Sequence, residues 1–112
     1  MEIVVDRHIE DVFAFVADPR HEPRWRSGVL AVEGDEPGPG ARHEVTHKRR
    51  LRAPRRTTRT CIAWEPPTRI AWRDDDGIET TIALEPAWTA TRIVTAASRA
   101  DLNALKRALE RG

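Results

Sequence analysis

The stretch from Asp6 to Gly28 constrains the fold more strongly than any other part of the chain. Its apolar side chains recur at helical spacing, at Ile9, Val12, Phe13 and Val16. Asp6 is the predicted N-cap of this helix, and Asp18 followed by Pro19 ends it, because proline cannot continue a helix but can begin one. Asp18 then caps a second short helix that carries Trp25 toward a stop at Gly28. The stretch therefore predicts a helix, a break, and a short second helix with a buried tryptophan.

The region after Gly28 is typical of short strands separated by turns. Turn-forming residues gather at 34–40, 53–54, 66–67 and 74–77. Between these turns polar and apolar side chains alternate with a period of two, which predicts an antiparallel sheet with one covered face and one wet face. The side chains predicted on the covered face are Ile62, Trp64, Ile70, Trp72, Ile78, Ile82 and Leu84.

The end of the chain predicts a closing helix. Ser98 suits the N-cap because Asp101 follows it three residues later. Leu102, Leu105 and Leu109 then form an apolar stripe at helical spacing, which must lie on the covered face of the sheet. At 1.5 Å per residue this helix would span only about 20 Å.

The order of these elements, together with several short motifs, resembles the START-related SRPBCC superfamily of polyketide cyclases and dehydrases. The motifs are VFAFVADP at 12–19, PRW at 23–25, EPPTRIAW at 65–72 and IALEP at 82–86. The resemblance implies an α+β helix-grip fold of the START and Bet v 1 type. Its parts would be a curved antiparallel sheet of about six to seven strands, two short helices after the first strand, and a C-terminal helix packed on the sheet. With 112 residues we expect a single domain, 1–112.

The resemblance also implies a binding function. Members of the superfamily commonly hold a hydrophobic or amphipathic small molecule between the sheet and the C-terminal helix. The candidate ligand-binding residues are Trp25, Ile62, Trp64, Ile70, Trp72, Ile82, Leu84, Trp88, Leu102 and Leu105. For each of these, packing within the core is the alternative role. A closing helix this short favours a shallow groove, or a cavity completed by a homodimer, over a deep closed pocket.

The second interpretation is an enzyme resembling the polyketide aromatases and cyclases, with polar pocket residues guiding proton transfer. His43 and His47 would share one side of a strand, about 13 Å apart, too far to chelate one metal but suited to general-base or hydrogen-bonding roles. If Trp64 and Ile62 point inward, the same period places Arg56 on that face, where it could meet a carboxylate or phenolate. No motif for a metal or other cofactor is found, and the absence of tyrosine argues against this interpretation.

Charge is distributed unevenly along the chain. Between residues 41 and 73, ten basic residues stand against two acidic ones, whereas the remainder has nine basic and sixteen acidic residues. The basic hairpin 42–59 could bind an anionic partner, although like-charged exposed strands also resist edge-to-edge aggregation without any partner. Nucleic acid is disfavoured because the basic segment lacks stacking aromatics.

The remaining features concern the location of the protein in the cell and the state of its cysteine. No apolar run approaches the roughly 20 residues that a membrane span needs, and the N-terminus lacks the features of a signal peptide, so we expect a cytoplasmic protein. The single cysteine, Cys61, lies in a predicted strand and is expected to be buried and unreactive.

Overall fold

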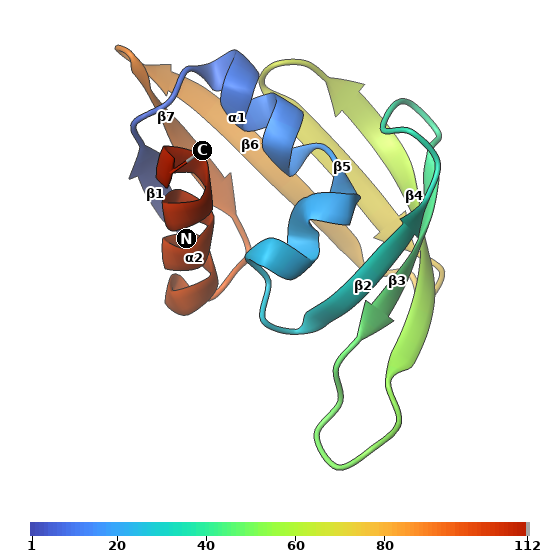
Figure 1. The fold of residues 1–112 in the computed structure, drawn as a ribbon. Helices are drawn as coiled ribbons and strands as arrows, with labels where there is room; N and C mark the ends of the chain where they lie inside the picture. Colours follow the sequence, from blue (N-terminus) through green and yellow to red (C-terminus); the bar gives the residue numbers. More distant parts are fainter. Residues whose placement is uncertain (112) are drawn as a thin grey trace.

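The computed structural model describes residues 1–111 as an open sheet with its helices gathered on one face (Figure 1). The elements in chain order are β1 (Glu2–Val5), α1 (Ile9–Val16), the 3-10 helix η1 (Pro19–Arg24), β2 (Val29–Gly34), β3 (Arg42–His47), β4 (Arg55–Glu65), β5 (Arg69–Asp74), β6 (Glu79–Ala87), β7 (Ala90–Thr95) and α2 (Arg99–Arg111). The seven strands follow the order β1-β7-β6-β5-β4-β3-β2, with antiparallel neighbours throughout. The predicted helix-grip fold is confirmed.

The first helix begins later than the sequence predicts. Its N-cap position is His8, whose side chain makes no capping hydrogen bond. Asp6 lies in the turn after β1, where its backbone N–H donates to the Glu110 carboxylate of α2 at 2.8 Å. The capping role predicted for Asp6 is therefore wrong, because a tertiary contact holds this residue outside the helix.

The short second helix follows the prediction closely. The Asp18 carboxylate accepts a hydrogen bond from the backbone N–H of Arg20 at 3.0 Å, and Pro19 occupies the first helical position. Trp25 ends the helix and is only 2% exposed. The Asp-Pro break thus sets both the start of η1 and the burial of the tryptophan that follows.

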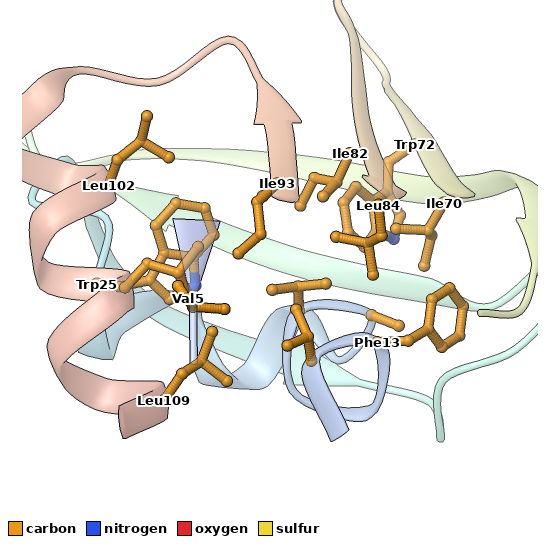
Figure 2. Packing of buried hydrophobic residues seen from close by; sticks show 14 of the residues in the cluster. Val5, Phe13, Trp25, Ile70, Trp72, Ile82, Leu84, Ile93, Leu102 and Leu109 are labelled. Carbon is orange, nitrogen blue, oxygen red and sulfur yellow. The ribbon is translucent and has the colours of Figure 1, made fainter. Parts of the chain in front are cut away.

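The core lies between the helices and the inner face of the sheet (Figure 2). From α2, Leu102, Leu105 and Leu109 are buried as the stripe predicts, and the Ser98 hydroxyl accepts from the backbone N–H of Asp101 at 3.1 Å. The fully buried sheet residues that meet the helices include Ile70, Trp72, Ile82, Leu84 and Ile93. These side chains pack against one another in the centre of the grip.

A β-bulge in β4 changes which side chains face this core. The register between β4 and β5 shifts between Cys61 and Ala63, so one extra residue, Ile62, is inserted into β4. Ile62 is 41% exposed, whereas Trp64 packs edge-on against Phe13 with ring centroids 5.1 Å apart. The expectation that Ile62 and Trp64 share the covered face is wrong, because the bulge reverses the alternation between them.

Two other apolar side chains lie outside the core. Ile78, predicted on the covered face, is 59% exposed where the β5–β6 turn ends. Trp88 occupies the tight turn between β6 and β7 with φ of 62° and is fully exposed. The predicted position of Ile78 on the covered face is therefore wrong, whereas a ligand or dimer contact at the exposed Trp88 stays a prediction.

Candidate functional site

A cluster of buried charges lies inside the grip, where η1 faces β4 and β5. The Arg59 guanidinium donates through Nη1 to Glu22 Oε2 and through Nε to Asp74 Oδ1, the latter at 3.3 Å. The three residues are 5%, 1% and 8% exposed. Buried charges are retained when each is paired, so this ion-pair triad is a structural unit that ties η1 to the sheet.

A second arginine extends the cluster toward α2. Arg26 Nε lies 3.3 Å from Glu22 Oε1 without an aligned hydrogen bond, and its guanidinium stacks 4.4 Å from the ring centroid of Trp25. Burial lowers the pKa of Arg26, and the attraction of Glu22 opposes that shift. Arg59 lies likewise 5.4 Å from the Trp72 ring. Each buried guanidinium therefore pairs with a carboxylate and an indole.

Three buried donor atoms beside this cluster lack a hydrogen-bond acceptor within residues 1–111. They are the indole Nε1 of Trp25 and the Nε and Nη2 of Arg26, of which Nε still lies close to Glu22. Both residues line a hollow of about 260 Å³ between η1 and the first turns of α2. The donor atoms themselves are buried beside the hollow and are not exposed in it, so they remain unpaired within the packing.

The adjoining hollow is larger and basic. Its volume is about 580 Å³, and it is lined by Arg24, Ala104, Arg107, Ala108 and Arg111. The two hollows share Arg24 and Ala104, so they form one continuous depression between η1 and α2, the α2 groove. The larger hollow has an apolar floor of alanines beneath a rim of guanidinium groups, and Asp101 adds one carboxylate to the lining of the smaller hollow.

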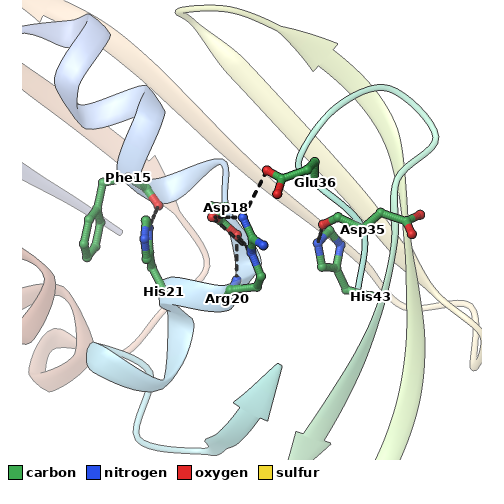
Figure 3. A network of polar contacts seen from close by, with 7 residues as sticks. All are labelled: Phe15, Asp18, Arg20, His21, Asp35, Glu36 and His43. Carbon is green, nitrogen blue, oxygen red and sulfur yellow. Dashed lines mark hydrogen bonds and ion pairs between the residues drawn. The ribbon is translucent and has the colours of Figure 1, made fainter. Parts of the chain in front are cut away.

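The two histidines of β3 face the interior, as the strand period predicts. His43 is 1% exposed, and its Nε2 donates to the Asp35 carbonyl oxygen at 2.8 Å, while Nδ1 has no partner in the described chain (Figure 3). His47 Nε2 lies 2.9 Å from the Thr57 hydroxyl. Desolvation and the nearby Arg55 lower the pKa of His47, so its imidazole is uncharged at neutral pH.

A polar clamp holds η1 in place (Figure 3). Arg20 pairs with Asp18 at 2.9 Å and reaches Glu36 of the following loop at 3.4 Å. Burial opposes ionisation of Asp18, but the side-chain and backbone hydrogen bonds from Arg20 outweigh it and hold the carboxyl pKa below its usual value. The clamp positions Glu22 and Trp25, because both residues belong to the same short turn.

The predicted site residues fall into three groups. Ile70, Trp72, Ile82, Leu84, Leu102 and Leu105 pack against one another in the core, with Trp64 at its margin. Trp25 bridges the core and the α2 groove. Arg56 is exposed and lies 3.7 Å from Glu44, so its predicted inward position is wrong for the same reason as that of Ile62.

Sequence reasoning missed the residues that form the polar interior and the groove. Arg59 rather than Arg56 faces the interior, because the bulge at Ile62 shifts the alternation of β4 by one residue. Its partner Glu22 is 37 positions away, beyond the reach of any periodic pattern. Thr57, Arg59 and Cys61 alternate along β4 and so share one face of the strand. This pattern identifies Arg59 as an inward residue only if the position of the bulge is already known.

Two further kinds of feature, a membrane-spanning helix and a cluster of metal ligands, are absent from residues 1–111. Among residues 1–111, no helix is long and apolar enough to cross a membrane. The same residues contain no group of three or more His, Cys, Asp or Glu side chains arranged to hold a metal ion. Cys61 is buried, and burial raises the pKa of its thiol.

Comparison with solved structures supports the fold. A protein from Deinococcus radiodurans superimposes with a TM-score of 0.75 at 20% identity, covering 100% of this chain and 95% of that one. The Zhui aromatase/cyclase from a Streptomyces species gives a TM-score of 0.74 at 16% identity, covering 99% and 92%. The di-domain aromatase/cyclase BexL of the BE-7585A biosynthetic pathway gives 0.74 at 20% identity, covering 98% of this chain and 45% of that one.

Comparison at the level of sequence identifies the family. No curated protein matches the chain. Residues 1–111 match the family described as polyketide cyclase/dehydrase and lipid transport, and the match spans all three helices and every strand described above. The chain belongs to the polyketide cyclase/dehydrase and lipid transport family.

Proposed function

We propose that the protein binds an amphipathic small molecule that carries an anionic group, and that the α2 groove receives it. The observation that carries this proposal is the set of rim arginines, Arg24, Arg107 and Arg111, which line the groove without an ion-pair partner in the described chain. A carboxylate, phosphate or sulfonate oxygen would accept hydrogen bonds from these guanidinium groups. The proposal keeps the binding function expected of the family but moves the ligand from the packed core to its margin.

The rim of the groove supports an anionic ligand. No ion pair involves Arg24, Arg107 or Arg111 among residues 1–111. Arg111 also complements the dipole at the end of α2, but Arg24 comes from η1 and has no such role. The Arg24 guanidinium lies 5.0 Å from the Phe15 ring centroid, and this contact favours one orientation of the guanidinium group.

The floor of the groove supports an apolar portion of the ligand. Ala104 and Ala108 lie one turn apart on α2 and leave the groove unfilled, because each side chain ends at Cβ. A smaller hollow of about 180 Å³ continues past Ala108 toward Phe15 and Leu109. Volumes in the range of several hundred Å³ are typical of sites for small organic molecules.

The first test measures binding of 1-anilinonaphthalene-8-sulfonate, an amphipathic aromatic sulfonate, by its own fluorescence and by quenching of tryptophan emission. Arg24→Ser with Arg107→Ser should weaken binding at least about tenfold, because two charge-assisted hydrogen bonds are lost. The matched control is Arg92→Ser with Arg99→Ser, which removes the same charge from exposed positions outside the groove. Equal affinity of the two double variants would contradict the proposal.

A second candidate function is proton transfer, and His47 is the observation that favours it. Its imidazole faces the interior, is bonded to the Thr57 hydroxyl, and has a pKa lowered by burial and by Arg55. An uncharged imidazole can act as a general base. The test is base-catalysed deuterium exchange of a β-diketone followed by NMR, where His47→Gln should abolish any rate above background. Identical rates for the two proteins would remove this candidate.

Two further expectations from the sequence stay predictions. A homodimer would be tested by native mass spectrometry, which also reports any small molecule that is retained on purification. A cytoplasmic location would be tested by fractionation of cells that produce the protein.

A further inference from the structure

The β3–β4 hairpin projects beyond the body of the sheet and ends in a strongly basic loop (Figure 1). The loop of residues 48–54, here called the basic tip, joins the end of β3 to the start of β4. Its cations are Lys48, Arg49, Arg50 and Arg52, and it contains no acidic residue. Every residue of the tip is exposed.

The cations of the tip are not neutralised by neighbouring carboxylates. The ion pairs of the hairpin involve its strands: Arg55 with Asp76 at 3.2 Å and Arg56 with Glu44 at 3.7 Å. Within the tip, Arg49 Nε donates to the Ala53 carbonyl oxygen at 3.0 Å, which helps to shape the loop. Among residues 1–111 no ion pair involves a cation of the tip, so its positive charge is available to a partner.

One apolar side chain, that of Leu51, lies among the cations of the basic tip. Leu51 is 96% exposed and adopts a φ of 58°, a conformation that residues other than glycine rarely adopt. It lies in the sequence between Arg50 and Arg52. A large apolar side chain flanked by cations, at the end of a projecting loop, matches the two-part chemistry of a bilayer interface, where phosphates lie above acyl chains.

We propose that the basic tip docks the protein on an anionic lipid bilayer, with Leu51 entering the boundary between head groups and acyl chains while the four cations of the tip contact lipid phosphates. Each cation close to such a surface strengthens binding about fivefold. A nucleic acid fits less well, because the tip offers no aromatic platform for bases and a leucine gains nothing from a phosphate backbone. The tip is well separated from α2, so docking leaves the α2 groove open (Figure 1).

The test is co-sedimentation with vesicles of phosphatidylcholine alone or mixed with phosphatidylglycerol. The protein should bind the mixed vesicles and not the neutral ones, and added salt should weaken binding. Arg49→Ser with Arg50→Ser should reduce the affinity about 25-fold, and Leu51→Ser should reduce it severalfold with a smaller change in salt dependence. Circular dichroism and thermal melting verify that these loop variants fold.

The matched control is again Arg92→Ser with Arg99→Ser, which removes two cations that are remote from the tip. It should bind the mixed vesicles as the parent protein does. Equal binding by the tip variant and this control, or equal binding to neutral and anionic vesicles, would overturn the proposal. Tip-dependent binding to duplex DNA without binding to vesicles would overturn it as well. Binding of 1-anilinonaphthalene-8-sulfonate is measured on the same variants. This measurement distinguishes a failure of the bilayer proposal from a failure of the α2-groove proposal.

Discussion

The β3–β4 hairpin carries arginines in two contrasting settings. Arg59 of β4 is 5% exposed and is bonded to Glu22 and Asp74, whereas Arg49 and Arg50 of the basic tip are exposed and have no carboxylate partner in the described chain. Arginine therefore stabilises the fold at position 59, whereas on the basic tip it is free to bind an external anion. What distinguishes them is burial, because a desolvated charge must be paired whereas a hydrated one need not be.

The largest expected effect comes from breaking the buried triad. Glu22→Ala leaves both Arg59 and Arg26 without a carboxylate that each now contacts, and should lower the free energy of unfolding by about 3–5 kcal/mol. Chemical denaturation measures the change. Arg49→Ala on the tip is the counterpart, with an expected change within about 0.5 kcal/mol. A loss of less than about 1 kcal/mol for Glu22→Ala would show that the triad does not act as a structural unit.

Apolar side chains sharpen the same contrast. Leu105 of α2 is 0% exposed, whereas Leu51 of the tip is 96% exposed. Leu105→Ala should cost about 2–5 kcal/mol of unfolding free energy through lost burial and the cavity left behind. Leu51→Ala should leave stability almost unchanged while weakening vesicle binding. Thermal unfolding of both variants makes the comparison, and similar melting temperatures would refute it.

The clamp on η1 yields a prediction for acid pH. The pKa of Asp18 in the folded protein lies below its ordinary value of 3.8, so folding favours the ionised carboxylate. That stabilisation is present above the unfolded pKa and is lost as pH falls through the folded pKa. Asp18→Ala should therefore cost about 1 kcal/mol at neutral pH, with the cost shrinking below about pH 4. Denaturation curves at several pH values test this; a cost that does not vary with pH would contradict it.

His47 should give the smallest effect. Because its folded-state pKa is lowered from 6.5, the unfolded chain binds the proton more tightly. Stability is therefore greatest above pH 6.5 and falls as pH drops from 6.5 toward the folded pKa. NMR titration of the His47 ring measures the shift directly. In His47→Gln the loss of stability between pH 7 and pH 5 should be smaller than in the parent protein.

Local sequence patterns predicted most of the fold. The Asp18-Pro19 break, the Ser98 cap and the leucine stripe of α2 each depend on residues close together in the chain, and each is confirmed, whereas the strand period fails at the bulge in β4. The candidate site was predicted less well. Of the residues that line the α2 groove, only Trp25 was foreseen, because it follows η1 directly and was expected to be buried.

The sequence alone determined the inward side of β3 and the main helices and strands, because these follow from periodicities and turn residues that act locally. Its short motifs, by their resemblance to a known family, also pointed to the family and to the α+β helix-grip fold. Only the tertiary structure decided that Arg59 rather than Arg56 enters the interior, and that Arg24 meets Arg107 across a groove. The physical reason is that a one-residue bulge reverses strand alternation. The packing of η1 against α2 likewise joins residues that no local pattern relates.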